Sequence, residues 1–266
     1  MFRNLKRYFH EKKHGKNIYL VYSMGKVGSS TVTELLEKQY PFLPVFQLHF
    51  LSDYWIKQLI PSMPAHYHVN LAPAEAFRKF RESHPDYRLK IITLVREPVI
   101  RDISDIFENW QDFFKTKNVD DLQIDRIMER LHQHEFEYSL NWFDSEFKAW
   151  TGVDIYTQKF EKQRGYSSWK FDAFDVLCIK LERLDQVLIP AMSEFCGLRL
   201  RMENNSNVSA QKNIAQLYKL ASTTFKLSKR QEHLVFDSLL VNHFYSPEEI
   251  AKFKIRWLDQ SKNEMA

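Results

Sequence analysis

Short apolar runs that alternate with helical segments are the feature that most limits what this chain can fold into. Residues 18–23 (IYLVYS), 90–95 (KIITLV) and 174–180 (FDVLCIK) are rich in β-branched and aromatic side chains. Continuous runs of this length are typical of strands that are buried on both faces. Helical spacing follows, as at Val32 and Leu36 after the first run. This alternation predicts a mostly parallel sheet with helices on both sides.

The remaining segments complete the pattern. A further strand is expected at 45–49, and weaker strand signals lie at 153–156 and 166–169. Helices are expected to begin near residue 29 and to cover 51–60, 73–82, 98–115, 120–150, 184–195 and most of 210–260. We therefore expect an α/β protein with a three-layer fold, a mostly parallel central sheet and extra helices. The chain divides into a basic N-terminal segment, 1–16, and a single domain, 17–266.

The composition limits the classes of partner. The 266 residues carry a net charge of +4, because 38 cations nearly balance 34 anions. This charge does not indicate a nucleic-acid partner, whereas an anionic small molecule needs only a local cluster of cations. Neither Cys178 nor Cys196 belongs to a set with zinc-ligand spacing, so no metal is expected. Cys178 lies within an apolar run and is expected to be a buried thiol in a reducing compartment.

Residues 1–16 (MFRNLKRYFHEKKHGK) are basic and also carry Phe2, Leu5, Tyr8 and Phe9. They lack the apolar stretch of a signal peptide, and the chain holds no span of about eighteen apolar residues. Two interpretations stay open: an amphipathic helix on an anionic membrane, and a solvated or loosely docked helix, which short basic segments favour. We expect a cytoplasmic protein that is peripheral to the membrane only if the first interpretation holds.

A loop with two glycines follows the first strand and leads into a helix. It reads Met24-Gly25-Lys26-Val27-Gly28-Ser29-Ser30-Thr31. A helix N-terminus exposes unpaired N–H groups and partial positive charge, so this arrangement favours an anion. Gly25 and Gly28 would let the backbone curl close to a phosphate, and Lys26 would add a positive charge. Further donors would be the hydroxyls of Ser29, Ser30 and Thr31.

This loop is not a Walker A motif. That motif requires GxxxxGK[ST], whereas Lys26 precedes Gly28 and no lysine follows it. A magnesium-dependent NTPase is therefore disfavoured. The simpler alternative to an anion site is an ordinary strand-to-helix turn with Ser29 or Ser30 as the N-cap.

A second motif, R-x-P-x-x-R-x-x-S, starts at Arg96 at the end of the strand 90–95. Arg96 would emerge at the carboxyl end of the sheet, where the ligands of open α/β folds collect. Its guanidinium group suits a phosphate, and the Ser104 hydroxyl would complete the site. The alternative for Arg96 is a surface ion pair, and Arg101 is expected to form one with Asp102 or Asp105. Two such sites suit a ligand with two separated phosphate-like groups.

Both motifs resemble those of the sulfotransferase superfamily, particularly its carbohydrate-modifying and bacterial capsular-polysaccharide branch. Weaker similarities extend to residues 181–184 (LERL), 207–209 (NVS) and 243–246 (HFYS). Val27 departs from the pattern of other branches, which often place a small polar residue or Thr there. The resemblance implies a P-loop-NTPase-like fold. It also implies 3′-phosphoadenylyl sulfate as the donor, leaving as adenosine 3′,5′-bisphosphate, without a metal.

The resemblance also implies roles for individual residues. Residues 24–31 correspond to the 5′-phosphosulfate loop, and Lys26 would neutralise the bridging and leaving oxygens. Arg96 and Ser104 correspond to the 3′-phosphate site. The predicted nucleotide-binding residues are Gly25, Lys26, Val27, Gly28, Ser29, Ser30, Thr31, Arg96 and Ser104. Lys212 is either a further contact to the nucleotide or a solvated lysine at a helix start, which we favour.

Transfer to a hydroxyl also requires a general base. We choose His49, because it ends the strand 45–49 on the same edge as the loop and its imidazole can accept a proton near neutral pH. The alternative is a hydrogen-bonded structural histidine. The other candidates are His66, His68, Asp53 and Glu108.

These features favour a sulfotransferase that acts on a hydroxyl of a saccharide. The aromatic-rich region 107–150 would line an acceptor cleft, although aromatics at helical spacing more often belong to a core. Two other functions stay open. A nucleotide-dependent kinase is opposed by the missing Walker lysine and by the lack of a clear magnesium-binding carboxylate. A nucleotide-binding protein without transferase activity is opposed by Lys26.

Overall fold

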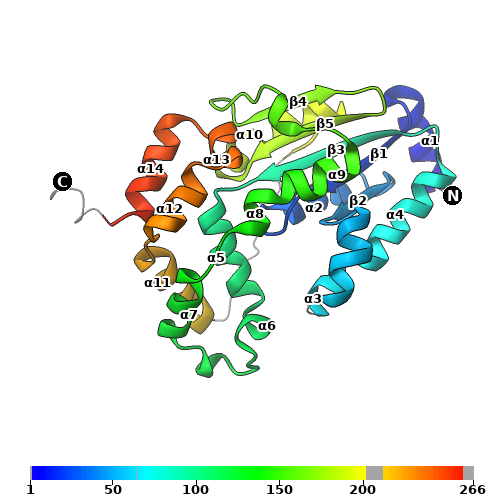
Figure 1. Cartoon of the computed structure of the whole chain (residues 1–266). Helices are drawn as coiled ribbons and strands as arrows, with labels where there is room; N and C mark the ends of the chain where they lie inside the picture. The colour runs from blue at the N-terminus through cyan, green and yellow to red at the C-terminus, as the bar shows by residue number, and fades with distance from the viewer. Residues whose placement is uncertain (1, 64, 202–211, 260–266) are drawn as a thin grey trace. The chain divides into compact units, whose positions relative to one another are not determined.

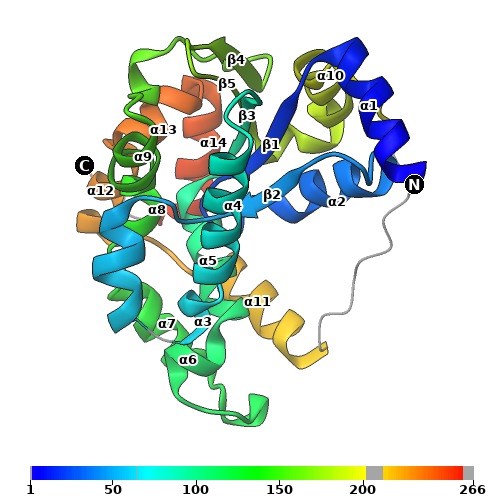
Figure 2. The ribbon, with the colours of Figure 1, turned by 90° about the vertical axis from the view of Figure 1, so that its right-hand side faces the viewer.

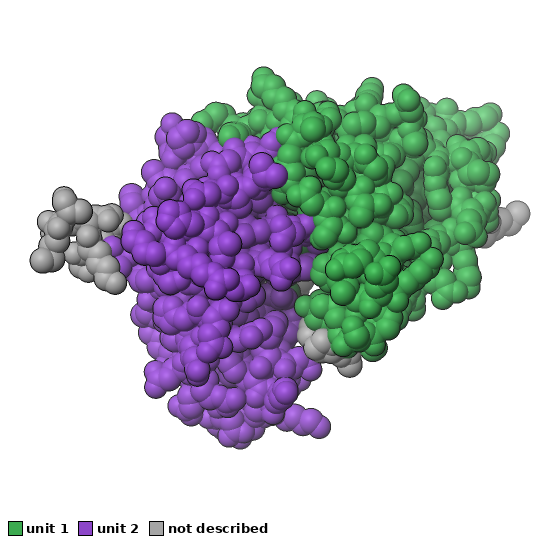
Figure 3. Space-filling model, in the orientation of Figure 1, with its two compact units in different colours: residues 1–96, 143–204 green, residues 97–142, 205–266 purple. Residues whose placement is uncertain are grey.

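The computed structural model describes residues 2–63, 65–201 and 212–259 (Figure 1). Contacts between residues group the chain into two compact units (Figure 3). Unit 1 holds residues 1–96 and 143–204, and unit 2 holds residues 97–142 and 205–266. The single domain over 17–266 stays a prediction.

A five-stranded sheet in the order β2-β1-β3-β5-β4 forms the centre of unit 1. Its strands are β1 (Asn17–Tyr22), β2 (Val45–Leu48), β3 (Arg88–Val95), β4 (Tyr166–Lys170) and β5 (Phe174–Lys180). β1 pairs in parallel with β2 and β3, β3 pairs in parallel with β5, and β4 runs antiparallel at the edge. The register sets Tyr22 opposite Leu48 and Val95 opposite Lys180. The carboxyl ends of the parallel strands therefore lie along one edge.

Helices cover both faces of this sheet (Figure 2). The longer ones are α1 (Phe2–His14), α2 (Ser29–Gln39), α4 (Leu71–Ser83) and α10 (Leu184–Cys196). The shorter ones are η1 (Tyr54–Leu59), η2 (Ile60–Ser62), α3 (Ala65–His68), η4 (Phe143–Lys148), α9 (Ala149–Thr151), η5 (Ile155–Thr157) and η6 (Leu181–Arg183). α2 and α10 lie on one face, while α4 and α9 lie on the other. Every residue of β1 is buried, as expected for a central strand covered on both sides.

Unit 2 is helical. Its helices are α5 (Pro98–Glu108), α6 (Trp110–Phe114), η3 (Val119–Asp121), α7 (Ile124–His132), α8 (Glu137–Trp142), α11 (Lys212–Thr224), α12 (Lys229–Phe236), α13 (Leu239–Phe244) and α14 (Pro247–Trp257). The Gln231 Nε2 donates to the carbonyl oxygens of Leu131 and His134 at 2.8 and 2.9 Å. These bonds hold α12 against the end of α7 and the residues that follow it. The side chain of Ser228 caps α12 and that of Ser246 caps α14.

The three-layer α/β fold is confirmed, and three local predictions are wrong. The stretch 120–150, predicted as one or two helices, is divided into η3, α7, α8, η4 and α9. Residues 153–156 do not form a strand, because the Asp154 side chain accepts a hydrogen bond from the Tyr156 N–H and starts the 3-10 helix η5. The helix predicted over 98–115 is interrupted at Asn109, which ends α5 and precedes α6. The weak strand signal at 166–169 is β4. Cys178 and Cys196 are both buried, and burial raises the pKa of each thiol.

Candidate active site

The loop between β1 and α2 turns through two residues in the left-handed region. Lys26 has a φ of 67° and Gly28 a φ of 85°, whereas Gly25 does not take a positive φ. The curl expected of Gly25 is therefore supplied by Lys26. A lysine in this conformation is strained by about 1 kcal/mol, because its Cβ crowds the carbonyl oxygen that follows. Strain of this kind persists where the surrounding structure holds it, and it often marks functional segments.

Gly28 has a positive φ, which L side chains rarely adopt, and it lies close to leucine side chains of unit 1. A Cβ at this position would lie 2.7 Å from Leu181 Cδ1 and 3.4 Å from Leu184 Cδ2. The close approach at Gly28 is therefore to η6 and α10, and the approach of a phosphate is not needed to explain this glycine. The same packing brings residues 181–184, one of the weaker sequence similarities, against the loop.

The N-terminus of α2 has Gly28 as its N-cap and no hydrogen bond from a capping side chain. The alternative in which Ser29 or Ser30 caps this helix is therefore wrong. Instead, the Gln47 Nε2 of β2 donates to the Ser29 and Ser30 oxygens at 3.0 and 3.4 Å. Because the serine oxygens act as acceptors here, their O–H groups remain donors for another partner. The sequence analysis did not identify Gln47 as a residue of this site, although a polar side chain inside the predicted strand 45–49 was a signal for it.

Arg96, the first residue of the second motif, contacts the loop inside unit 1. The Arg96 Nη1, just past the end of β3, donates to the carbonyl oxygen of Lys26 at 2.9 Å. This bond joins the strand end to the strained residue of the loop. The Arg96 guanidinium group therefore lies against the loop at the carboxyl edge of the sheet.

Ser104 belongs to unit 2, where it lies on α5. Its Oγ donates to the Ile100 carbonyl oxygen at 2.8 Å, and the Tyr218 hydroxyl lies 3.2 Å from that Oγ. The N-terminus of α5 is already capped, since the Glu97 carboxylate accepts from the N–H groups of Val99 and Ile100. An anion at Ser104 would therefore not bind to the amides of α5, and it would have to replace the Ile100 carbonyl oxygen as the acceptor of the hydroxyl hydrogen. Its part in a 3′-phosphate site stays a prediction.

Arg101 is buried and not part of a surface ion pair as predicted. Its guanidinium group pairs with Asp102 at 2.7 Å and with Asp105 at 3.3 Å, and 3% of its side chain is exposed. The second oxygen of Asp102 accepts from His134 Nε2 at 2.7 Å and from Ser139 Oγ at 3.1 Å. Although burial opposes ionisation, Arg101 and His134 lower the pKa of Asp102. The network links α5, α8 and the segment that follows α7, and it explains these polar groups as internal supports of unit 2.

His49, the predicted base, is tied to the residue before the loop. Its Nδ1 lies 2.6 Å from the Ser23 carbonyl oxygen. Because a carbonyl oxygen only accepts, Nδ1 carries the hydrogen, and in the neutral ring Nε2 holds the lone pair. This tautomer is the one that a general base acting through Nε2 requires.

The other candidate bases lie at the start of η1 and on α3 and α5. Asp53 is exposed and pairs with Lys57 and Arg78, at 2.9 and 3.2 Å. His68 lies at the end of α3, and the His66 side chain lies outside the described residues. Glu108 ends α5 in unit 2. For Lys212, the structure describes its position at the start of α11 but not its side chain, and 207–209 lie outside the described residues.

Glu146 is a buried carboxylate that the sequence did not single out. Its Oε1 accepts from the Tyr22 hydroxyl and from the N–H groups of Leu51 and Ser52, the last at 2.9 Å. Its Oε2 accepts from Ser52 Oγ at 2.5 Å. Glu146 therefore joins the end of β1 to the segment that directly follows His49. Burial is the main reason that its pKa is raised above the ordinary value of 4.5, although these hydrogen bonds oppose the shift.

We expect Glu146→Ala to lower the free energy of unfolding by about 3 kcal/mol, because Tyr22, Leu51 and Ser52 would lose a buried acceptor. Glu146→Gln keeps an acceptor at Oε1 and should cost less than about 1 kcal/mol. Urea denaturation measures both changes, and equal losses in the two variants would contradict this role.

The stability of the wild type and that of Glu146→Gln should also depend differently on pH. A carboxyl whose pKa is raised in the fold binds more protons when folded than when unfolded, so its contribution to stability falls as the pH rises through that window. The wild type should therefore lose stability relative to Glu146→Gln as the pH rises above about 4.5. Other titrating groups are common to both proteins and cancel in the difference.

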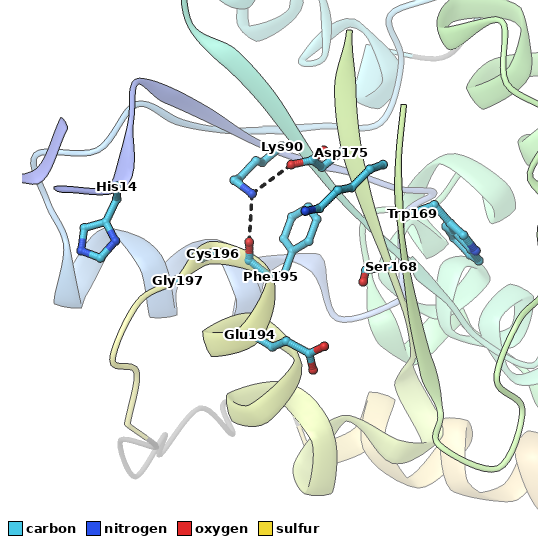
Figure 4. A pocket seen from close by; sticks show the side chains of 10 residues that line it. His14, Lys90, Ser168, Trp169, Asp175, Glu194, Phe195, Cys196 and Gly197 are labelled. Atoms are coloured by element: carbon cyan, nitrogen blue, oxygen red, sulfur yellow. Dashed lines mark hydrogen bonds and ion pairs between the residues drawn. The ribbon is translucent and has the colours of Figure 1, made fainter. Parts of the chain in front are cut away.

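A cavity in unit 1 lies away from the loop (Figure 4). Its volume is about 420 Å³, and it is lined at the amino ends of β3 and β5 and the carboxyl end of α10. Lys90 projects into this region, where it pairs with Asp175 at 3.1 Å and donates to the Phe195 carbonyl oxygen at 3.0 Å. Because parallel strands share direction, this cavity is at the opposite edge of the sheet from residues 24–31. The Lys90 ammonium group is therefore already paired with a carboxylate.

The aromatic-rich region 107–150 is mainly core. Trp110, Phe114, Trp142, Phe143 and Phe147 are all buried, with at most 8% of any of them exposed. For these five residues, the alternative prediction that the aromatics belong to a core is therefore confirmed. They provide no support for an aromatic acceptor cleft.

Within residues 2–63, 65–201 and 212–259, no three His, Cys, Asp or Glu side chains are grouped as ligands for a metal ion. Over the same residues, none of the helices combines the length and apolar character needed to cross a bilayer.

Comparison with known proteins yields one match. Residues 118–246 match a family model. The family, NKWYS, carries the description "Putative capsular polysaccharide synthesis protein". The match supports polysaccharide biosynthesis and the capsular-polysaccharide branch of the predicted resemblance, and it does not include the loop or Arg96. The chain matches no curated protein and no solved structure.

Proposed function

We propose that this protein is a sulfotransferase that moves a sulfuryl group from 3′-phosphoadenylyl sulfate to a hydroxyl group of a saccharide in polysaccharide biosynthesis. The family match supports the biosynthetic setting and the saccharide acceptor. The loop and the end of β3 support the donor. The observation that carries the proposal is the bond between Arg96 Nη1 and the Lys26 carbonyl oxygen, because it brings the first arginine of the second motif against the loop at one edge of the sheet.

The residues at this edge fit a donor with two anionic ends. The N-terminus of α2, which has no side-chain cap, offers N–H groups. The Ser29 and Ser30 oxygens accept from Gln47, so each hydroxyl can donate its hydrogen to an anion. In the proposal, these groups hold the 5′-phosphosulfate and Arg96 holds the 3′-phosphate. Ser104 is the second proposed ligand of the 3′-phosphate.

The proposed chemistry uses His49 and Lys26. His49 Nε2 takes the proton from the acceptor hydroxyl as its oxygen forms a bond to sulfur. The bond between sulfur and the bridging oxygen breaks, and its electron pair stays on the departing phosphate. Lys26 neutralises the charge that develops on this oxygen. The tautomer fixed by the Ser23 carbonyl oxygen leaves His49 Nε2 as the proton acceptor in this step.

Transfer of labelled sulfate tests the proposal directly. The full chain is incubated with the ³⁵S-labelled donor and a panel of capsular oligosaccharides, and binding of adenosine 3′,5′-bisphosphate is measured by isothermal titration. We expect binding without magnesium and label in the saccharide. Binding without transfer to any acceptor would favour a nucleotide-binding protein, and a preference for ATP with magnesium would favour a kinase. Either result would overturn the proposal.

A further inference from the structure

Helix α1 is held against unit 1 by one of its faces. The Arg7 Nη2 donates to the Tyr87 hydroxyl at 2.7 Å, and the same hydroxyl donates to Glu11. One turn further, the His10 ring contacts the rings of Tyr40 and Phe42, with centroids 6.2 and 5.5 Å apart. Residues 7, 10, 11 and 14 lie along one side of a helix. This side fixes α1 to the elements around the sheet.

The opposite side of α1 carries large apolar side chains that remain exposed. Leu5, Tyr8 and Phe9 are 51%, 50% and 62% exposed. Their spacing of three and four residues places them on one face of the helix. The Tyr8 and Phe9 rings contact each other, and Lys12 Nζ lies 5.1 Å from the centre of the Tyr8 ring. We call Leu5, Tyr8 and Phe9, with Lys12, the outer face of α1.

Positive charge surrounds this outer face. Lys6, Lys12 and Lys13 are exposed, and the only acidic residue between 2 and 14 is Glu11. Glu11 lies on the docked side, where it pairs with Arg7 at 2.8 Å. The outer face therefore presents apolar side chains and cations without a compensating carboxylate of the helix.

We propose that the outer face of α1 binds the surface of a membrane that contains anionic phospholipids. An interfacial helix inserts Leu, Phe and similar side chains at the boundary between headgroups and acyl chains, while flanking lysines contact anionic headgroups. A soluble polyanion would satisfy the lysines but would leave Leu5 and Phe9 in water. Because the docked side already holds α1 as a helix, binding does not require the segment to fold. This surface is independent of the transfer chemistry.

Vesicle co-sedimentation of the full chain tests this surface. Vesicles of phosphatidylcholine are compared with vesicles that also contain about 30% phosphatidylglycerol. We expect binding only to the anionic vesicles. Phe9→Glu and the double variant Lys12→Glu/Lys13→Glu should each weaken it about tenfold. The matched control is Leu239→Glu, since Leu239 is 64% exposed on α13 in unit 2. This variant should change binding by less than about twofold.

Several results would overturn the membrane surface. These are equal binding to neutral vesicles, equal loss in the Leu239→Glu control, or binding that depends on the lysines and not on Phe9. A fourth is self-association of the chain in solution that Phe9→Glu removes, because it would assign the face to a second copy. Thermal unfolding of each variant is measured beside the binding, and unchanged midpoints exclude misfolding as the cause of a loss.

Discussion

Arg96→Ala is expected to weaken the binding of adenosine 3′,5′-bisphosphate by about 30-fold or more, because a charge-assisted hydrogen bond to a phosphate is worth about 2 kcal/mol. The variant also removes the bond from Nη1 to the Lys26 carbonyl oxygen, so the loop loses a support as well as a ligand. Isothermal titration without magnesium measures this loss. Arg96→Lys retains the charge without the planar fork, so its affinity for the nucleotide should lie between those of the wild type and Arg96→Ala.

Arg88 provides a matched control on the same strand. It lies at the amino end of β3 and pairs with Asp175 at 2.6 Å, at the far edge of the sheet from the loop. Arg88→Ala removes the same side chain and the same charge. It should lower stability but change nucleotide binding by less than about twofold. Equal losses of affinity in the two alanine variants would mean that Arg96 acts through general stability or net charge, and it would remove the 3′-phosphate site from the proposal.

Lys26→Ala is expected to lower the rate of sulfuryl transfer by about 100-fold or more, with the donor affinity changed by less than about threefold. The reason is that charge on the bridging oxygen grows only as the bond to sulfur breaks, so the ammonium group acts mainly in the transition state. Single-turnover transfer of labelled sulfate gives the rate, and titration with adenosine 3′,5′-bisphosphate gives the affinity. Equal losses in both would contradict the catalytic role.

The backbone at Lys26 allows a second comparison. Because its φ is 67°, alanine at this position keeps the left-handed strain and glycine relieves it. Lys26→Gly should therefore be as inactive as Lys26→Ala but more stable than it by about 1 kcal/mol. Urea denaturation measures the difference. An alanine variant that is as stable as the glycine variant would show that the backbone at residue 26 is not strained.

Local sequence patterns were sufficient to predict the strands that are buried on both faces. The runs at 18–23, 90–95 and 174–180 are strands, since a strand covered on both faces must be apolar along its whole length. The pattern at 153–156 misled, because the short-range hydrogen bond of Asp154 outweighs the weak preference of its neighbours for a strand. Arg101 misled for a different reason. Its burial depends on Asp102 and Asp105, and a sequence does not show that such a group of charges is enclosed.

The sequence by itself determined the three-layer α/β fold, the loop at 24–31 and the arginine at the end of β3. These depend on neighbouring residues and on the rule that parallel strands end at one edge. Only the tertiary structure decided that Lys26 takes the strained turn, that Gln47 orients Ser29, and that Glu146 supports the segment after His49. Each of these depends on residues far apart in the chain that the parallel register and helix packing bring within hydrogen-bonding distance.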